Sequence, residues 1–176
     1  MEHLRLPKND RFAFYVNVYN AVVLKTVAER FSPGWTVAEN NYGIFDEPLV
    51  RLSDRQISLN NLEKDLTWNA FKDPRMHVAF VCAAVSCPPL LNRAYQGATM
   101  EKTLDDSMRS WLTRGVRNKV DTSSKTLQLS KIFEWYAKDF GGTDAIVSYV
   151  DQWHPGDLTG YTISYLEYDW TLNVTR

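Results

Sequence analysis

The residues whose types and spacing best support chemistry lie in one run, from Met76 to Leu91, which holds both cysteines and one of the three histidines. His77, Cys82 and Cys87 follow one another at intervals of five residues. A thiol becomes a useful nucleophile when a nearby imidazole or another positive charge lowers its pKa and a third group orients that imidazole. We therefore take Cys87 as the candidate nucleophile and His77 as its candidate base.

This run predicts a buried strand that ends in a rigid turn. Residues 78–82 are apolar, with β-branched and aromatic side chains at their centre, as is typical of a strand covered on both faces. Cys82 then belongs to the core as a small packed residue. Cys87 lies beyond the strand, before Pro88–Pro89, which restrict its backbone, so we expect it to be the exposed and more reactive thiol. Ser86 and Cys82 are counted as binding residues around it.

Three other interpretations of these residues stay open. His77 could serve the structure alone, as a lone histidine at a strand end often does. Cys82 and Cys87 could form a disulfide if the protein is exported. A metal site is not expected, because the spacing H-x4-C-x4-C matches none of the common zinc patterns and a fourth ligand is not evident. We expect no cofactor.

A second group of candidates lies on one short predicted helix. Lys131, Trp135 and Asp139 follow one another at intervals of four residues, so they share one face of that helix. A packed tryptophan between two solvated charges would explain the pattern without a function. The functional interpretation is that Asp139 or Glu134 orients His77 as a catalytic partner, or that Lys131 binds a carboxylate. The binding candidates on this helix are Lys131, Trp135 and Tyr136.

The longest predicted element is a helix from about Asp10 to Phe31, which is apolar nearly all round and should therefore be central. Asn17 and Asn20 are the exceptions, and they are neighbours on one face because they lie three residues apart. A buried amide costs roughly 1–3 kcal/mol unless its hydrogen bonds are made. We expect both amides to bond to main chain or to the run Met76–Leu91, either tying loops to the helix or forming the polar wall of a site.

The remaining elements alternate short strands and short helices. We predict hairpins at 50–52 with 56–59 and at 120–122 with 126–129, helices at 60–70, 131–140 and 143–153, a helix capped by Thr99 and stopped by Gly115, and a last strand at 163–174. The class is therefore α+β, with the central helix packed on a mainly antiparallel sheet. We expect residues 1–176 to form a single domain.

Composition and charge argue against several classes of function. The net charge is −1 and no basic block is visible, so nucleic acid is not expected as a partner. No apolar run is long enough for a membrane span. The first residues, Met1 to Arg5, are polar and do not resemble a signal peptide.

Four segments, in this order, resemble the family filed as domain of unknown function 547. They are FYVNVYNA (14–21), HVAFVCAAVSCPPL (77–90), LSKIFEWYAKDFG (129–141) and YLEYDWTLN (165–173), and together they extend over nearly the whole chain. The resemblance implies a bacterial protein, often carried behind an export signal, or a plant protein, often beside a coiled-coil segment. It therefore implies an exported or periplasmic location, and a chain that is the C-terminal part of a longer protein.

The chain also has a distant similarity to papain-like and transglutaminase-like folds, which place a helix against an antiparallel sheet with cysteine and histidine at the seam. In those enzymes the thiol lies at the start of the central helix, whereas here that helix carries Asn17 and Asn20 and no cysteine. This departure leaves the transfer of a papain-type triad open.

Two functions from different classes follow. The first is a thiol-dependent hydrolase or acyl transferase that acts on a peptide-like or glutathione-like amide through Cys87 and His77. The second is a non-catalytic module that binds a peptide or a partner protein in a polar cleft. The cysteine–histidine run favours the first function, and the coiled-coil context of the plant relatives favours the second.

Overall fold

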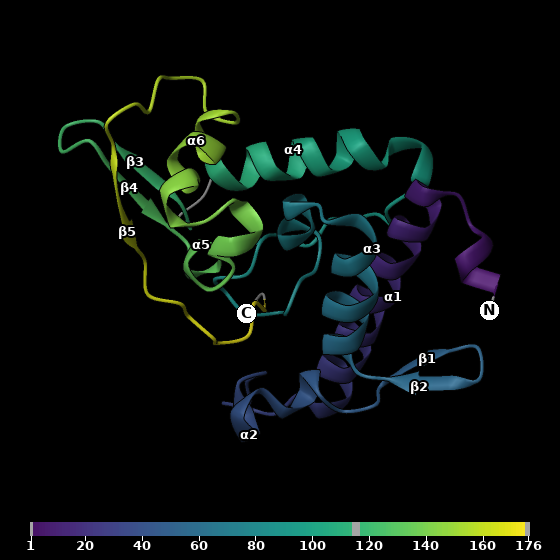
Figure 1. Ribbon diagram of the computed structural model, residues 1–176. Helices are drawn as coiled ribbons and strands as arrows, with labels where there is room; N and C mark the ends of the chain where they lie inside the picture. The colour runs from purple at the N-terminus through teal and green to yellow at the C-terminus, as the bar shows by residue number, and fades with distance from the viewer. Residues whose placement is uncertain (1, 114–116, 175–176) are drawn as a thin grey trace.

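The computed structural model describes residues 2–113 and 117–174 (Figure 1). Its α-helices are α1 (Lys8–Arg30), α2 (Glu39–Tyr42), α3 (Asn69–Phe71), α4 (Met100–Thr113), α5 (Lys131–Trp135) and α6 (Ile146–Asp151). A π-helical stretch, η3 (Asn61–Trp68), continues into α3, and short 3₁₀ helices include η4 (Pro74–Val78) and η6 (Ala137–Phe140). The strands are β1 (Val50–Leu52), β2 (Arg55–Ile57), β3 (Lys119–Asp121), β4 (Thr126–Leu129) and β5 (Thr162–Tyr165). The mixture of helix and sheet confirms the predicted α+β class.

Both predicted hairpins are confirmed. Strands β1 and β2 pair antiparallel, as do β3 and β4. Strand β5 joins the second sheet parallel to β4, with Leu127 opposite Ile163. The prediction of one strand from 163 to 174 is wrong beyond Tyr165, because the chain there leaves the sheet. Its backbone bonds instead to the cysteine-bearing turn, from the Asn173 N–H to Ala83 O at 2.8 Å and from the Val85 N–H to Thr171 O at 2.8 Å.

Helix α1 matches its prediction closely and forms the centre of a first core cluster. Val16 is fully buried, and α1 packs against η3, α4 and β1. Its outer edge is open, since Leu24 is half-exposed, so the helix is central without being enclosed. The main members of this cluster are Phe12, Tyr15, Val16, Tyr19, Val23, Leu59 and Leu62.

The strand predicted for residues 78–82 does not form. The chain makes η4 and then an irregular turn, and the backbone groups that a strand would pair are taken by a side chain of α1. The Asn20 amide donates to Ala79 O at 2.8 Å and accepts the Val81 N–H at 3.0 Å. Because a buried backbone group needs a partner of some kind, this amide replaces the neighbouring strand that we expected.

Helix α4 joins two cores. Leu104 packs into the first cluster, while Met108, Trp111 and Leu112 pack into a second cluster around β4, α5 and α6. This inner face agrees with the prediction, and Gly115, the predicted stop, lies outside the described residues. Figure 1 shows α4 running from the α1 side of the molecule to the sheet side. The second cluster centres on Leu127, Leu129, Phe133, Phe140 and Ile146.

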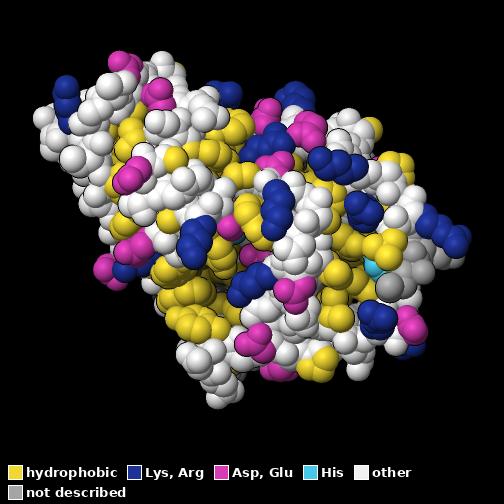
Figure 2. Space-filling model, in the orientation of Figure 1, with side chains coloured by type: hydrophobic (Ala, Val, Ile, Leu, Met, Phe, Trp, Pro, Cys, Tyr) yellow, Lys and Arg dark blue, Asp and Glu magenta, His cyan; other side chains and the backbone are white. Residues whose placement is uncertain are grey.

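The surface carries both signs of charge. On the face in Figure 2, lysine and arginine side chains alternate with aspartate and glutamate, and apolar side chains show between them. Within residues 2–113 and 117–174, no helix is both long enough and apolar enough to cross a membrane.

Candidate functional site

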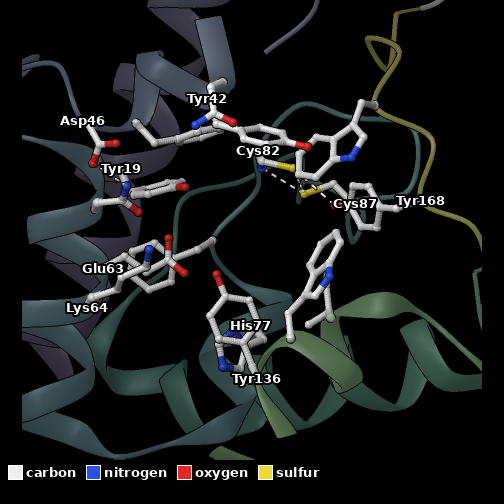
Figure 3. Close-up of a pocket in the computed structure, with 17 residues that line it drawn as sticks. Tyr19, Tyr42, Asp46, Glu63, Lys64, His77, Cys82, Cys87, Tyr136 and Tyr168 are labelled. Carbon is white, nitrogen blue, oxygen red and sulfur yellow. Dashed lines mark hydrogen bonds between the residues drawn. The ribbon is translucent and has the colours of Figure 1, made fainter. Parts of the chain in front are cut away.

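A cavity of about 490 Å³ opens between the two core clusters, and it collects most of the reactive side chains (Figure 3). Its walls come from α1, η3, η4, the turn after η4, α5 and the segment after β5. Segments far apart in the sequence therefore meet here. The polar residues that line it are Tyr19, Asn41, Tyr42, Asp46, Asn60, Glu63, Lys64, His77, Cys82, Cys87, Tyr136 and Tyr168.

The two cysteines form a contact pair of free thiols in one turn, residues 82–87. Their Sγ atoms lie 2.7 Å apart, and the Cys82 N–H donates to Cys87 Sγ at 2.9 Å. Tyr168, from the segment after β5, places its hydroxyl 3.4 Å from Cys82 Sγ. The chain reverses at Ala83, whose φ of +68° lies in the left-handed region.

The expectation that Cys87 is the exposed thiol is wrong. Cys87 is 2% exposed, whereas Cys82 is half-buried and reaches the cavity. The cause is the segment after β5, which lies along the turn and forms an antiparallel bridge between Leu172 and Ala84. Sequence position alone placed Cys87 at an open exit, and a distant part of the chain covers it.

The surroundings of the two thiols shift their pKa values in opposite directions. Burial raises the pKa of Cys87 well above its ordinary value. The hydrogen bond from Cys87, and then that from the Tyr168 hydroxyl, lower the pKa of Cys82 despite its burial. These opposite shifts favour Cys82 over Cys87 as the site of the first thiolate of the pair.

His77 contacts the carboxylate of Asp139, one of the two acids that the sequence analysis proposed as its partner. Its Nε2 lies 2.9 Å from Asp139 Oδ2, and its ring packs against Tyr136 at 4.3 Å between centroids. Glu134, the other candidate, lies beside Lys131 instead, at 3.7 Å. Asp139 is therefore the group that fixes the tautomer and orientation of this imidazole.

The imidazole and the thiols face one another across the cavity without touching. Figure 3 shows the sulfur atoms on one side of the open space and His77 on the other. Among the hydrogen bonds of the described residues, none joins His77 to either sulfur; its partner is Asp139, and the thiols bond to each other and to Tyr168. A group bound in the cavity would lie between the thiolate and the imidazole.

A half-buried acid adds a further titratable group that the sequence analysis missed. Glu63 in η3 lines the cavity, and desolvation raises its pKa, while the charge of His77 acts in the opposite direction. Its neighbour Tyr19 in α1 is buried, and burial raises the pKa of that hydroxyl well above its ordinary value. The available signal was the position of Glu63 beside Leu62, on the apolar face of the helix predicted at 60–70.

Aromatic rings surround the mouth of the cavity. Trp135 is 47% exposed and packs on Tyr168 at 4.9 Å and on Trp170 at 5.7 Å between centroids. Tyr42 packs on Trp170 from the opposite side at 4.7 Å. Trp135 and Tyr136 thus line the cavity, as the sequence proposed for binding residues, and Tyr168 and Trp170 from the segment after β5 join them.

The other predicted binding residues lie outside the cavity. Asn17 donates to Tyr95 O and accepts the Tyr95 N–H, both at 2.8 Å. With the bonds of Asn20 described above, this confirms that both amides bond to main chain, so they tie loops to α1. Ser86 accepts the Asp169 N–H at 2.9 Å, and it shares a separate hollow of about 190 Å³ with Lys131.

Within the described parts of the chain, no group of three or more histidine, cysteine or acidic side chains is arranged to hold a metal ion. The thiol pair and His77 stand on opposite walls of the cavity. The side chains gathered around the cavity are a thiol pair, an aspartate-bound imidazole and a half-buried carboxyl group.

Residues 3–112 match the family described as "Protein of unknown function, DUF547". This match extends over more than half of the chain, so the chain belongs to that family, as the sequence motifs indicated. Comparison with curated proteins and with solved structures gave no match. The matched segment contains Glu63, His77 and both cysteines, whereas Asp139 and Tyr168 come from the part of the chain that follows it.

Proposed function

We propose that this protein is a thiol-dependent acyl hydrolase or acyl transferase that acts on a peptide-like or glutathione-like amide. The observation that carries the proposal is the convergence, in one cavity, of a thiol pair and an imidazole bound to a carboxylate. A nucleophile, a proton-transfer group and an orienting acid are the three parts that thiol-based acyl transfer needs.

The roles in this proposal follow the surroundings of each group. Cys82 replaces Cys87 as the nucleophile, because it is the more exposed of the two thiols and its contacts with Cys87 and the Tyr168 hydroxyl lower its pKa. His77 transfers the proton, and Asp139 stabilises the imidazolium form by its 2.9 Å contact. Cys87 supports the thiolate through its hydrogen bond and stays protonated.

The reaction starts from the Cys82 thiolate and a protonated His77. The sulfur attacks the carbonyl carbon of the amide and the C–N bond breaks, while His77 gives its proton to the leaving amine. Water in a hydrolase, or a second amine in a transferase, then attacks the thioester. The C–S bond breaks, His77 takes the proton of the attacking group, and the thiolate is restored.

The separation of the thiols from His77 across the cavity fits this sequence of events. An amide bound between the two walls places its carbonyl carbon toward Cys82 and its leaving nitrogen toward His77. The substrate, rather than a direct thiol–imidazole bond, then links nucleophile and acid. The rings of Trp135 and Trp170 at the mouth offer apolar faces to the substrate's side chains.

An activated acyl donor tests the proposal without knowledge of the natural substrate. With p-nitrophenyl acetate, mass spectrometry should find one acetyl group on Cys82, and Cys82→Ser should abolish it. Asp139→Asn and His77→Ala should slow release of the acetyl group at least about tenfold, in keeping with the usual contribution of acid–base groups. Glu134→Gln, on the neighbouring helix α5 and away from His77, is the matched control. An unacylated Cys82, or release that is unchanged in both variants, would refute the proposal.

The aromatic mouth supports the second candidate, a non-catalytic module that binds a peptide. Rings of Tyr42, Trp135, Tyr168 and Trp170 would hold a ligand whether or not the thiols react. Reduced glutathione and short peptides serve as probes, with tryptophan fluorescence as the readout. Binding that is lost in Trp135→Ala and unchanged in Cys82→Ser, with no acyl transfer, would favour this candidate.

A further inference from the structure

The turn that carries the thiols holds them in a position from which a disulfide can close. The Sγ atoms lie 2.7 Å apart, and a disulfide bond of about 2.05 Å requires each sulfur to move by well under 1 Å. Main-chain hydrogen bonds hold the turn at both ends. Its bonds are Cys87 N–H to Ala84 O at 3.1 Å and the two main-chain bonds to the segment after β5.

The two thiols differ in access from the cavity. Both thiols line the cavity, but Cys82 is half-buried, whereas Cys87 is only 2% exposed. A small oxidant that enters the cavity therefore meets Cys82 first. Cys87 is then the only other cysteine in the chain, and it is in contact.

We propose that Cys82 and Cys87 form a peroxide-reactive pair, in which hydrogen peroxide or an organic hydroperoxide oxidises Cys82 and Cys87 closes a disulfide with it. This inference shares Cys82 with the proposed function and goes beyond it, because the pair reacts in this way whether or not the cavity transfers acyl groups.

The reaction balances with peroxide as the only co-reactant. The Cys82 thiolate attacks one peroxide oxygen, the O–O bond breaks, and the departing oxygen takes a proton to leave as an alcohol or as water. The Tyr168 hydroxyl, 3.4 Å from Cys82 Sγ, is placed to assist that proton transfer. Sulfur now carries a hydroxyl group as a sulfenic acid. Cys87 attacks this sulfur, the S–S bond forms, the S–O bond breaks, and the hydroxyl leaves as water with the Cys87 proton.

The disulfide has a direct consequence for the cavity. Two electrons pass from the thiols to the peroxide, and Cys82 ceases to be a nucleophile. An external thiol restores it by exchange, and the attack must occur at the Cys82 sulfur because Cys87 is covered. Oxidation would thus stop any acyl transfer reversibly and protect Cys82 from irreversible oxidation.

Intact-mass measurements on the reduced protein test this pair. After hydrogen peroxide at equal concentration, the natural sequence should lose two hydrogens, and dithiothreitol should restore them. Cys87→Ser should stop at a sulfenic acid on Cys82 that dimedone traps, and Cys82→Ser should give neither product. Non-reducing peptide mapping of the unmodified sequence locates the bond without any variant.

Several results would overturn the inference. They are direct conversion of Cys82 to sulfinic acid in the natural sequence, an unchanged mass after peroxide, or a dimedone adduct on Cys87 in Cys82→Ser at the rate seen for Cys82. The test is separate from that of the proposed function, because disulfide closure is read by mass alone. A pair that closes but accepts no acetyl group retains this inference and removes the acyl-transfer proposal, and the reverse result does the opposite.

Discussion

Helix α1 and the turn at residues 82–87 each hold two polar side chains in the interior, and they use them differently. In α1, the side-chain amides of Asn17 and Asn20 form hydrogen bonds to main-chain groups, at 2.8–3.0 Å. In the turn, Cys82 and Cys87 bond to each other, and Cys82 also opens on the cavity. The two amides, whose hydrogen bonds are all made within the protein, stabilise the fold. Cys82, which also faces the cavity, is available for chemistry.

The comparison also shows how the two regions depend on each other. Asn20 holds Ala79 O and the Val81 N–H, the backbone groups that immediately precede Cys82. The amide therefore fixes where the turn begins, and the segment after β5 fixes where it ends. Asn17 holds only Tyr95, so the two amides provide matched variants of which one acts on the turn.

The largest effect that sharpens this comparison is expected from alkylation of the folded protein. Cys82 should take up iodoacetamide with a pH profile whose midpoint lies below that of the same thiol in the unfolded chain, since its pKa is lowered by Cys87 and Tyr168. Cys82→Ser should abolish labelling of the native state. Peptide mapping after a short pulse measures which thiol reacts. Labelling of Cys87 ahead of Cys82 would contradict the assignment.

The next largest effect concerns the amides. Asn20→Ala and Asn17→Ala should each lower the free energy of unfolding by about 1–3 kcal/mol, because each strands two main-chain groups. Only Asn20→Ala should also shift the alkylation profile of Cys82, since only Asn20 holds the turn. Urea unfolding and pulse alkylation on both variants measure the two quantities. If the two variants shift the profile equally, α1 does not position the thiols through Asn20.

The helices and hairpins of this chain were predictable because their signals are local. The apolar stripe of α1, the inner face of α4 and the hairpin pattern around residues 120–129 each depend on neighbours a few residues away. The strand predicted at 78–82 failed for the opposite reason. An apolar run shows burial but not the partner of its backbone, and here the partner is a side chain 59 to 61 residues distant.

The candidate site was predictable only in part. The sequence offered Asp139 or Glu134 as the partner of His77, and the fold brings Asp139 to it. The burial of Cys87 was not predictable, because the cover comes from a segment that was predicted to continue a strand. Glu63 belongs to no motif, and Tyr168 lies in the motif at 165–173 without a predicted role in the site; each reaches the cavity only through tertiary packing.

A smaller effect should come from the second proton donor to the thiolate. Tyr168→Phe removes the hydroxyl 3.4 Å from Cys82 Sγ and should move the alkylation profile of Cys82 to higher pH. The shift should be smaller than that of Cys87→Ala, because the bond with Cys87 is the larger cause of the lowered pKa of Cys82. Tyr165→Phe, in β5 of the same segment, is the matched control. An unchanged profile in Tyr168→Phe would leave Cys87 as the only donor that matters.

The smallest effect concerns Glu63, which lines the same cavity as the two thiols. Burial raises the pKa of Glu63 in the folded protein, so the native state binds this proton more tightly than the unfolded chain does. The free energy of unfolding should therefore fall as the pH rises from the ordinary glutamate range, about 4.3, through the raised folded value, and remain lower at pH 7. Glu63→Gln should remove that loss and raise the melting temperature at pH 7, with little change below about pH 4. Glu39→Gln, at an exposed carboxylate in α2, should change neither. If Glu63→Gln instead lowers the melting temperature at pH 7, the charges of His77 and of the adjacent Lys64 stabilise the ionised carboxylate, and desolvation is not the dominant effect.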